Sequence, residues 1–124
     1  MVALLDNSVF DSGLDTLDAD SNKIVITSQQ ATTFAEANAT YALGDSTTVS
    51  VGAPADRAGG GREVTVAAIT DGTVSSTATA SHYAILDTTG SVLLAANSLT
   101  NGQAVTSGNT FTLGSFTIGI PDPA

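Results

Sequence analysis

The chain has 124 residues, contains no cysteine, and carries twelve acidic against three basic side chains, which gives a net charge of −9. This length predicts a single domain over residues 1–124. The charge argues against nucleic acid and anionic membranes as partners, because proteins bind phosphate groups through Lys and Arg. The lack of cysteine excludes disulfides and thiolate metal sites.

The first residues contain no basic segment followed by an apolar stretch of signal-peptide length. We therefore expect synthesis in a cytoplasm without export through an N-terminal signal. No apolar run approaches the roughly 20 residues that a membrane-spanning helix needs, so no membrane partner is expected.

Residues 1–20 are predicted to form an N-terminal helix or arm. Five apolar residues recur at a spacing that favours one face of a short helix over residues 8–17. They are Leu5, Val9, Phe10, Leu14 and Leu17. Asn7 or Ser8 is expected to cap this helix. The alternative is an extended arm that is anchored on a neighbouring subunit.

Residues 21–61 are predicted to contain a strand, a helix and a glycine-rich loop. Three consecutive β-branched residues at 24–26 predict a strand that is buried on both faces. The sequence Thr-Phe-Ala-Glu at 33–36 is a capping-box pattern. It predicts a helix over residues 33–43 that ends at Gly44.

The rest of this segment is expected to be less regular. A short strand is predicted at residues 47–51. Three successive glycines at 59–61 then predict a loop over residues 52–61 that is mobile in the free protein. No Gly-Lys-Ser or Gly-Lys-Thr sequence follows these glycines, so a phosphate-binding loop is not expected.

Residues 62–120 are predicted to form an antiparallel β unit, followed by a tail at 121–124. Apolar, Thr-rich runs alternate with turn sequences, of which Asp-Gly and Asn-Gly are the strongest hairpin signals. The expected turns lie at 71–72, 88–90, 101–102 and 107–109. The predicted fold is mainly β with one or two short N-terminal helices. We expect an antiparallel β-sandwich or small barrel, built from consecutive hairpins in up-and-down order.

Two details of the β unit bear on packing. On a regular strand, Phe111 and Leu113 would point away from the face that Phe116, Ile118 and Ile120 occupy. A bulge or corner at residues 114–115 is therefore predicted, since it puts all five side chains on the core side. In the long run at 74–86, small residues share one face, which predicts close approach of another layer or subunit.

Side chains that could carry catalysis are few. His82 is the single histidine, and its neighbours favour a hydrogen-bonded strand residue over a member of a catalytic triad. Glu63, Asp71 and Asp87 are the carboxylates that a glycosidase could use. Two of them, Asp71 and Asp87, lie in or beside expected turns, where Asp is common. No catalytic residue, cofactor or enzymatic activity is therefore expected.

The acidic segment at 18–22 resembles the start of a calcium loop. An EF-hand requires Gly at the sixth position and Glu at the twelfth, whereas this chain has Lys23 and Gln29 there. We therefore expect a solvated turn and no metal site.

Five residues are candidate contacts with a protein partner. Leu4, Leu5 and Phe10 are apolar residues beside a β unit that is expected to close its core without them. Arg57 and Arg62 flank the glycine-rich loop and are two of the three basic residues of an acidic chain. The first group predicts apolar anchoring on a neighbour, and the second predicts a polar contact.

The β unit resembles small virion proteins of tailed bacteriophages, some of them head decoration or cement proteins and others tail-fibre-like. The residues that carry this resemblance lie between about 60 and 120. They are Val64-x-Val66, Gly72-Thr73-Val74, Ala80 to Asp87, Leu93-Leu94, Val105-x-x-Gly108-Asn109-Thr110 and Phe116-x-Ile118. The resemblance implies a β-rich structural module, often trimeric, on a capsid or tail. It transfers no functional residue.

From the resemblance we expect a non-enzymatic capsid decoration protein that binds the major capsid protein, self-associates as a homotrimer and stabilises the shell. The negative charge would be repelled by packaged DNA, which favours the outer surface of the virion. Synthesis would take place in the cytoplasm of the bacterial host. The alternatives are a tail or tail-fibre component involved in attachment, and an unrelated binding module or enzyme.

Overall fold

The computed structural model describes residues 6–121 of the chain. In this range the chain forms one α-helix, one π-helical segment and nine strands. In chain order they are α1 (Asn7–Asp20), β1 (Lys23–Thr27), η1 (Glu36–Thr40), β2 (Ala42–Ser46), β3 (Ala55–Asp56), β4 (Arg62–Val66), β5 (Ile69–Val74), β6 (Ala78–Asp87), β7 (Val92–Val105), β8 (Thr110–Leu113) and β9 (Phe116–Ile120). The protein is mainly β, as predicted.

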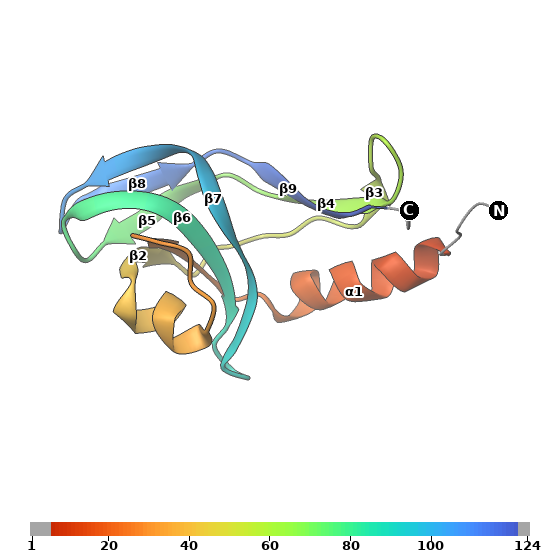
Figure 1. Ribbon diagram of the computed structural model, residues 1–124, viewed down its shortest axis with the longest axis horizontal. Helices are drawn as coiled ribbons and strands as arrows, with labels where there is room; N and C mark the ends of the chain where they lie inside the picture. The colour runs from red at the N-terminus through yellow and green to blue at the C-terminus, as the bar shows by residue number, and fades with distance from the viewer. Residues whose placement is uncertain (1–5, 122–124) are drawn as a thin grey trace.

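The strands form two antiparallel sheets. The larger sheet has the order β7-β6-β1-β2-β5-β8, and the smaller has the order β3-β4-β9. Figure 1 shows that the larger sheet curls into a half-barrel and that α1 runs alongside the smaller sheet. We call α1 and the smaller sheet together the extension. Neither helix in residues 6–121 is long and apolar enough to cross a lipid bilayer.

The strand order corrects one part of the prediction. The hairpin β6–β7 forms as expected, and consecutive strands also pair at β1–β2 and β3–β4, which was not predicted. However, β1 also pairs with β6, and β2 also pairs with β5, so the sheet is not in up-and-down order. A central strand such as β1 needs a hydrogen-bonding partner at each edge, and here distant segments supply it.

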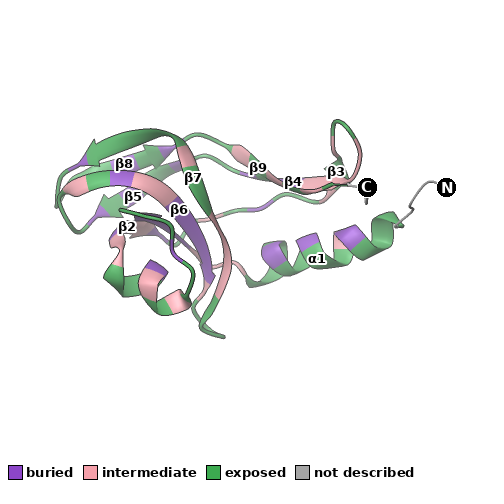
Figure 2. Ribbon diagram, in the orientation of Figure 1, coloured by how far each residue is buried: buried purple, intermediate pink, exposed green. Residues whose placement is uncertain are grey.

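The central strand β1 is buried on both faces, as its sequence predicts. Ile24 and Ile26 are fully buried in a core cluster that α1 and both sheets share. Val25 points the other way, into a second cluster with Ala84 of β6 and Ala37 of η1. Figure 2 shows buried positions on β6 and along α1. Ala84 packs against η1, so a close layer forms there as predicted, but Ala78 and Ala80 lie in the main cluster and do not share this face.

α1 is an amphipathic helix that starts earlier than predicted. Phe10, Leu14 and Leu17 are its buried residues, at the spacing of one helical face. The N-cap is Asp6, whose carboxylate accepts a hydrogen bond from the Ser8 N–H at 3.0 Å. The predicted caps, Asn7 and Ser8, follow the observed cap by one and two residues, because the Asp6 carboxylate already binds the first turn of the helix.

The predicted turn at 18–22 is also displaced. Asp18 and Asp20 belong to the last turn of α1, and the chain leaves the helix at Ser21. The Ser21 N–H still donates to the Leu17 carbonyl at 3.2 Å. The helix therefore continues through the acidic segment, whose carboxylates are exposed.

The second predicted helix is shorter than expected. η1 ends at Thr40, before the end of the predicted segment at 33–43. The Thr33 Oγ1 accepts from the Glu36 N–H at 3.2 Å, so one half of the capping box forms. The Glu36 carboxylate accepts instead from the Thr32 N–H at 2.9 Å.

Gly44 does not end a helix; it lies within β2. The backbone of Thr73 in β5 approaches Gly44 so closely that a Cβ at this position would clash. β2 also takes the place of the strand predicted at 47–51, of which only an isolated bridge between Val51 and Val66 remains. Gly44 allows β2 and β5 to pack closely. The sequence alone does not distinguish this role from that of a glycine that ends a helix.

The glycine-rich segment forms the turn of the β3–β4 hairpin. Gly59, Gly60 and Gly61 all have positive φ, at 86°, 106° and 92°. The Arg57 N–H donates to the Gly61 carbonyl at 3.0 Å, and the Gly60 N–H donates to the Arg57 carbonyl at 3.0 Å. This segment is more regular than expected because glycine tolerates these angles. Its mobility stays a prediction.

The turns predicted at 88–90 and 107–109 are confirmed. The other two turn sequences are inside strands, at 71–72 in β5 and at 101–102 in β7. Gly72 lies against the ring of Phe111, which leaves no space for a Cβ. The sequence at 101–102 lies where β7 bulges out of register with β6.

The chain turns a corner at residues 114–115, as predicted. β8 belongs to the larger sheet, whereas β9 pairs with β4 in the smaller sheet. Phe111 and Leu113 are buried, and Phe116 and Ile118 pack partly buried against the same core. The corner thus keeps all these side chains on the core side and joins the half-barrel to the extension.

Candidate binding groove

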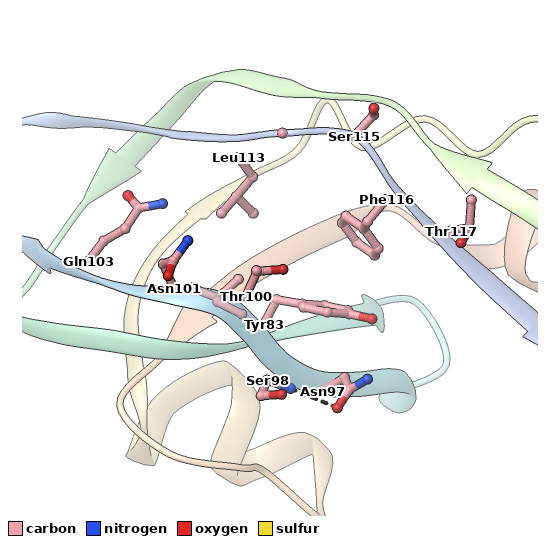
Figure 3. A pocket seen from close by; sticks show the side chains of 12 residues that line it. Tyr83, Asn97, Ser98, Thr100, Asn101, Gln103, Leu113, Ser115, Phe116 and Thr117 are labelled. Atoms are coloured by element: carbon pink, nitrogen blue, oxygen red, sulfur yellow. Dashed lines mark hydrogen bonds between the residues drawn. The ribbon is translucent and has the colours of Figure 1, made fainter.

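An open groove lies along one edge of β7, between the two sheets. β7 and β8 are the outer strands of the larger sheet, and β9 is an outer strand of the smaller one. β7 and the β8–β9 segment line opposite walls, and Tyr83 of β6 lies between them (Figure 3). The groove encloses about 380 Å³. Small-molecule sites typically enclose about 300–1,000 Å³.

The floor of the groove is aromatic and apolar. The ring centroids of Tyr83 and Phe116 are 4.5 Å apart, with an interplanar angle of 44°. Leu113 points toward the same space from β8 (Figure 3). Burial raises the pKa of Tyr83 above its ordinary value of 10.0. The phenol is therefore neutral at physiological pH and can both donate and accept a hydrogen bond.

β7 supplies the polar wall. Its amide and hydroxyl side chains at the groove are Asn97, Ser98, Thr100, Asn101 and Gln103. The Asn97 Oδ1 accepts from the Ser98 N–H at 2.8 Å, and the Gln103 Nε2 donates to the carbonyl of Thr112 in β8 at 3.4 Å. Within residues 6–121 no charged side chain lines this groove.

The backbone of both walls is irregular. The register of β7 against β6 shifts between Ser98, which pairs with His82, and Gln103, which pairs with Ala80. The opposite wall is interrupted at residues 114–115, between β8 and β9. Bulged and interrupted strands are poor edges for the addition of another strand. The side chains of the groove are therefore its main recognition groups.

A smaller apolar cavity lies between α1, β7 and β9. It encloses about 200 Å³, and its lining includes Leu14 of α1, Leu94 of β7, and Ile118 and Ile120 of β9. The same side chains belong to or pack against the main core cluster. The cavity opens to solvent beside Gly13 and Thr16 and offers few polar groups that would orient a ligand.

Arg62 connects the parts of the extension. Its Nε donates to the Asp11 carboxylate of α1 at 2.9 Å, and its Nη1 donates to the Asp56 carboxylate of β3 at 2.7 Å. The hydrogen bond to Asp11 is the main cause that raises the pKa of Arg62. Arg57 donates to the Gly60 carbonyl at 3.0 Å. Both arginines thus make contacts within the chain, and their role toward a partner stays a prediction.

Phe10 is placed differently from the expectation. It is only 2% exposed, on the same face of α1 as Leu14, so in this fold it is not available to a neighbouring subunit. Val9, at 53% exposed, is the apolar residue that α1 presents to solvent. Leu4 and Leu5 lie outside the described residues.

The residues considered for catalysis are not brought together. His82 is a hydrogen-bonded strand residue, as predicted, with its Nδ1 at 2.7 Å from the Ser81 Oγ. Glu63 lies in β4, Asp71 in β5 and Asp87 at the end of β6. Within residues 6–121 no group of three or more His, Cys, Asp or Glu side chains is placed to hold a metal ion.

Asp71 has a structural role that differs from the predicted turn. Its Oδ1 accepts hydrogen bonds from the Thr48 Oγ1 at 2.8 Å and from the Ser46 Oγ at 2.9 Å. The bonds from Thr48 and Ser46 lower the pKa of Asp71 below its ordinary value of 3.8. The carboxylate therefore joins β5 to the end of β2.

Comparisons with protein-family models, with curated proteins and with solved structures found no match. The polar wall of the groove had one signal in the sequence, because the run Asn-Ser-Leu-Thr-Asn-Gly-Gln at 97–103 lacks the alternation of a half-buried strand. No sequence pattern indicated that Tyr83 and Phe116 form the aromatic floor, because the two rings come together only when β9 follows the corner at residues 114–115.

Proposed function

We propose that the protein is a non-enzymatic structural component of a tailed-bacteriophage particle, a capsid decoration protein that binds the outer surface of the head. The observation that carries this proposal is where the residues of the resemblance lie. Val64, Val66, Val74 and Ile85 are buried core residues, and Gly108 has the positive φ of a turn. The likeness therefore includes packing positions of β4 to β9, although β1 and β2, which join β6 to β5 in the larger sheet, lie outside it.

The charge distribution suggests which surface contacts the shell. Asp15, Asp18 and Asp20 are exposed toward the C-terminal end of α1, and the exposed apolar residue Val9 lies in its first turn. A helix surface of this kind favours a partner surface with basic residues, and such an attraction weakens with added salt. In this proposal the major capsid protein provides that surface, and self-association as a homotrimer would present several helices to it.

The test is the copy number in the particle. Quantitative mass spectrometry of purified particles should find this protein at a number comparable with that of the major capsid protein. A number as small as that of tail proteins would reject the decoration role and favour the tail alternative.

A second test addresses the contact surface. Particles that lack the protein are mixed with the purified unmodified protein, with Val9→Asp, or with a variant that lacks residues 1–5. Both variants should occupy fewer sites on the shell than the unmodified protein does. Val92→Asp is the control and should bind normally, because Val92 is a comparably exposed valine (45%) in the β6–β7 hairpin. Equal loss for Val9→Asp and Val92→Asp would place the contact elsewhere.

One observation favours the tail alternative. The groove between β7 and the β8–β9 corner has the size and lining of a ligand site, and attachment to a host requires such a site. A tail or tail-fibre component involved in attachment is therefore the second candidate function.

A further inference from the structure

The groove combines an aromatic floor with uncharged hydrogen-bonding groups. Tyr83, which is only 7% exposed, and Phe116, which is partly exposed, form the aromatic pair, at 4.5 Å between centroids, so Phe116 presents the more accessible ring. Several polar side chains of its lining, among them Thr100, Asn101 and Thr117, make no hydrogen bond within the part of the chain that the structure describes. Their donors and acceptors are thus available to a ligand, and the open side of the groove gives access to them.

We propose that this groove binds a neutral saccharide of one or two sugar rings. A sugar ring presents C–H groups on its face, which pack against an aromatic ring, and hydroxyl groups around its rim. A side-chain amide offers a donor and an acceptor side by side, which match two adjacent hydroxyls. Asn101 and Gln103 stand on the polar wall opposite Phe116 and Leu113 (Figure 3).

The charge of the protein selects a neutral sugar over an acidic one. Within residues 6–121, no Lys, Arg or His lines the groove. The whole chain has a net charge of −9, which repels carboxylate, sulfate and phosphate groups as they approach. A uronic acid or a phosphorylated sugar would therefore bind more weakly than the corresponding neutral sugar.

The backbone geometry favours a saccharide over an extended peptide. A peptide that adds as a strand needs a regular row of free N–H and C=O groups. Here β7 loses its register between Ser98 and Gln103, and the opposite wall is interrupted at residues 114–115. The side-chain amides and hydroxyls are unaffected by these irregularities.

This inference goes beyond the proposed function and does not depend on it. A saccharide site would serve either a head or a tail protein, because cell surfaces carry sugars that both could meet. Its test uses the isolated full-length chain, so failure here leaves the copy-number test unaffected.

The experiment is an NMR titration of the full-length protein with glucose, galactose, N-acetylglucosamine and their β-linked disaccharides. At least one neutral sugar should shift the amide signals of residues 97–103 and 114–117 at millimolar concentration. Glucuronate should bind more weakly than glucose if glucose binds.

Matched variants test the polar wall. Asn101→Ala should weaken the binding of the best sugar roughly three- to tenfold, which corresponds to one lost hydrogen bond. Asn109→Ala is the control, because Asn109 is an exposed asparagine in the β7–β8 turn and does not line the groove. It should bind like the unmodified protein.

Three outcomes would overturn the proposal. The first is that no neutral sugar of the panel shifts the groove signals. The second is that the shifts lie elsewhere, or that Asn101→Ala and Asn109→Ala weaken binding equally. The third is that a polyalanine–valine strand peptide binds the groove and slows amide exchange along β7 and β9, while the sugars do not bind. That result would make the groove a strand-addition site.

Discussion

The half-barrel and the extension are stabilised in different ways. In the half-barrel, β1 and β6 are buried on both faces by two apolar clusters. In the extension, α1 buries one face against the smaller sheet, and the ion pairs of Arg62 with Asp11 and Asp56 connect its outer parts. Because α1 and both sheets share the main apolar cluster, a core substitution should weaken the whole molecule, whereas a change of salt should act mainly on the extension.

The largest effect is expected in the half-barrel. Ile85 is fully buried in the main core cluster, so Ile85→Ala should lower the free energy of unfolding by about 2–5 kcal/mol. Urea unfolding measures this loss. Val92→Ala, at an exposed site, should change the free energy by less than about 0.5 kcal/mol. Similar losses for the two variants would mean that the half-barrel is not the main source of stability.

The turn of the β3–β4 hairpin offers a matched pair in the extension. Gly59 and Gly61 both have positive φ, but a Cβ at Gly61 would clash with the Ile120 carbonyl of β9, whereas nothing lies within 4 Å of one at Gly59. Gly59→Ala should cost about 1–2 kcal/mol from backbone strain alone. Gly61→Ala should cost more and should speed amide exchange in β9. Equal costs would show that β9 moves aside freely.

The ion pairs of Arg62 should make the extension sensitive to salt. Arg62→Lys keeps the charge but loses the fork that reaches Asp11 and Asp56 at once. Amide exchange in α1 should be faster in this variant, and added NaCl should change it less than in the unmodified protein. Arg57→Lys is the control, because Arg57 donates to a carbonyl, that of Gly60, rather than to a carboxylate. Faster exchange throughout β1 would contradict the separation of the two regions.

The smallest effect is expected at Asp71 and depends on pH. Its pKa is lowered from 3.8 by the hydrogen bonds from Thr48 and Ser46. The ionised carboxylate therefore stabilises the fold above this ordinary pKa, and that contribution is lost as the pH falls through the lower pKa of the folded state. Asp71→Asn should be less stable than the unmodified protein at neutral pH.

Unfolding at several pH values checks this sign. The difference between Asp71→Asn and the unmodified protein should shrink as the pH falls below 3.8. Asp15→Asn is the control, since Asp15 is exposed on α1, and it should show little difference at any pH. A difference that grows on acidification would contradict the role of the carboxylate.

The sequence predicted those parts of the fold that depend on local pattern. The β-branched run at 24–26 indicates a strand buried on both faces, because no polar residue interrupts it. The conflict of faces between Leu113 and Phe116 indicates the corner at 114–115. The apolar spacing of α1 indicates its buried face, although the resulting burial of Phe10 was not foreseen.

Glycine caused two of the errors because it has two roles. Gly44 and Gly72 were interpreted as a helix stop and part of a turn, but each makes room for a neighbouring strand or ring. That second role depends on which segment lies opposite, and the pairing of distant strands decides this. The groove has the same origin, since Tyr83 and Phe116 come from strands that the local sequence does not connect.

The pairing of β1 with β6 also affects how the chain is made. β1 leaves the ribosome early, but its partner strand β6 is synthesised much later, so Ile24 cannot pair with Ile85 until then. In the meantime a hairpin of β1 and β2 would leave the edge of β1 unpaired, and such an edge is prone to aggregation. Folding through such distant pairings is slow compared with the folding of helical proteins. We therefore expect slower synthesis at lower temperature to raise the yield of folded protein.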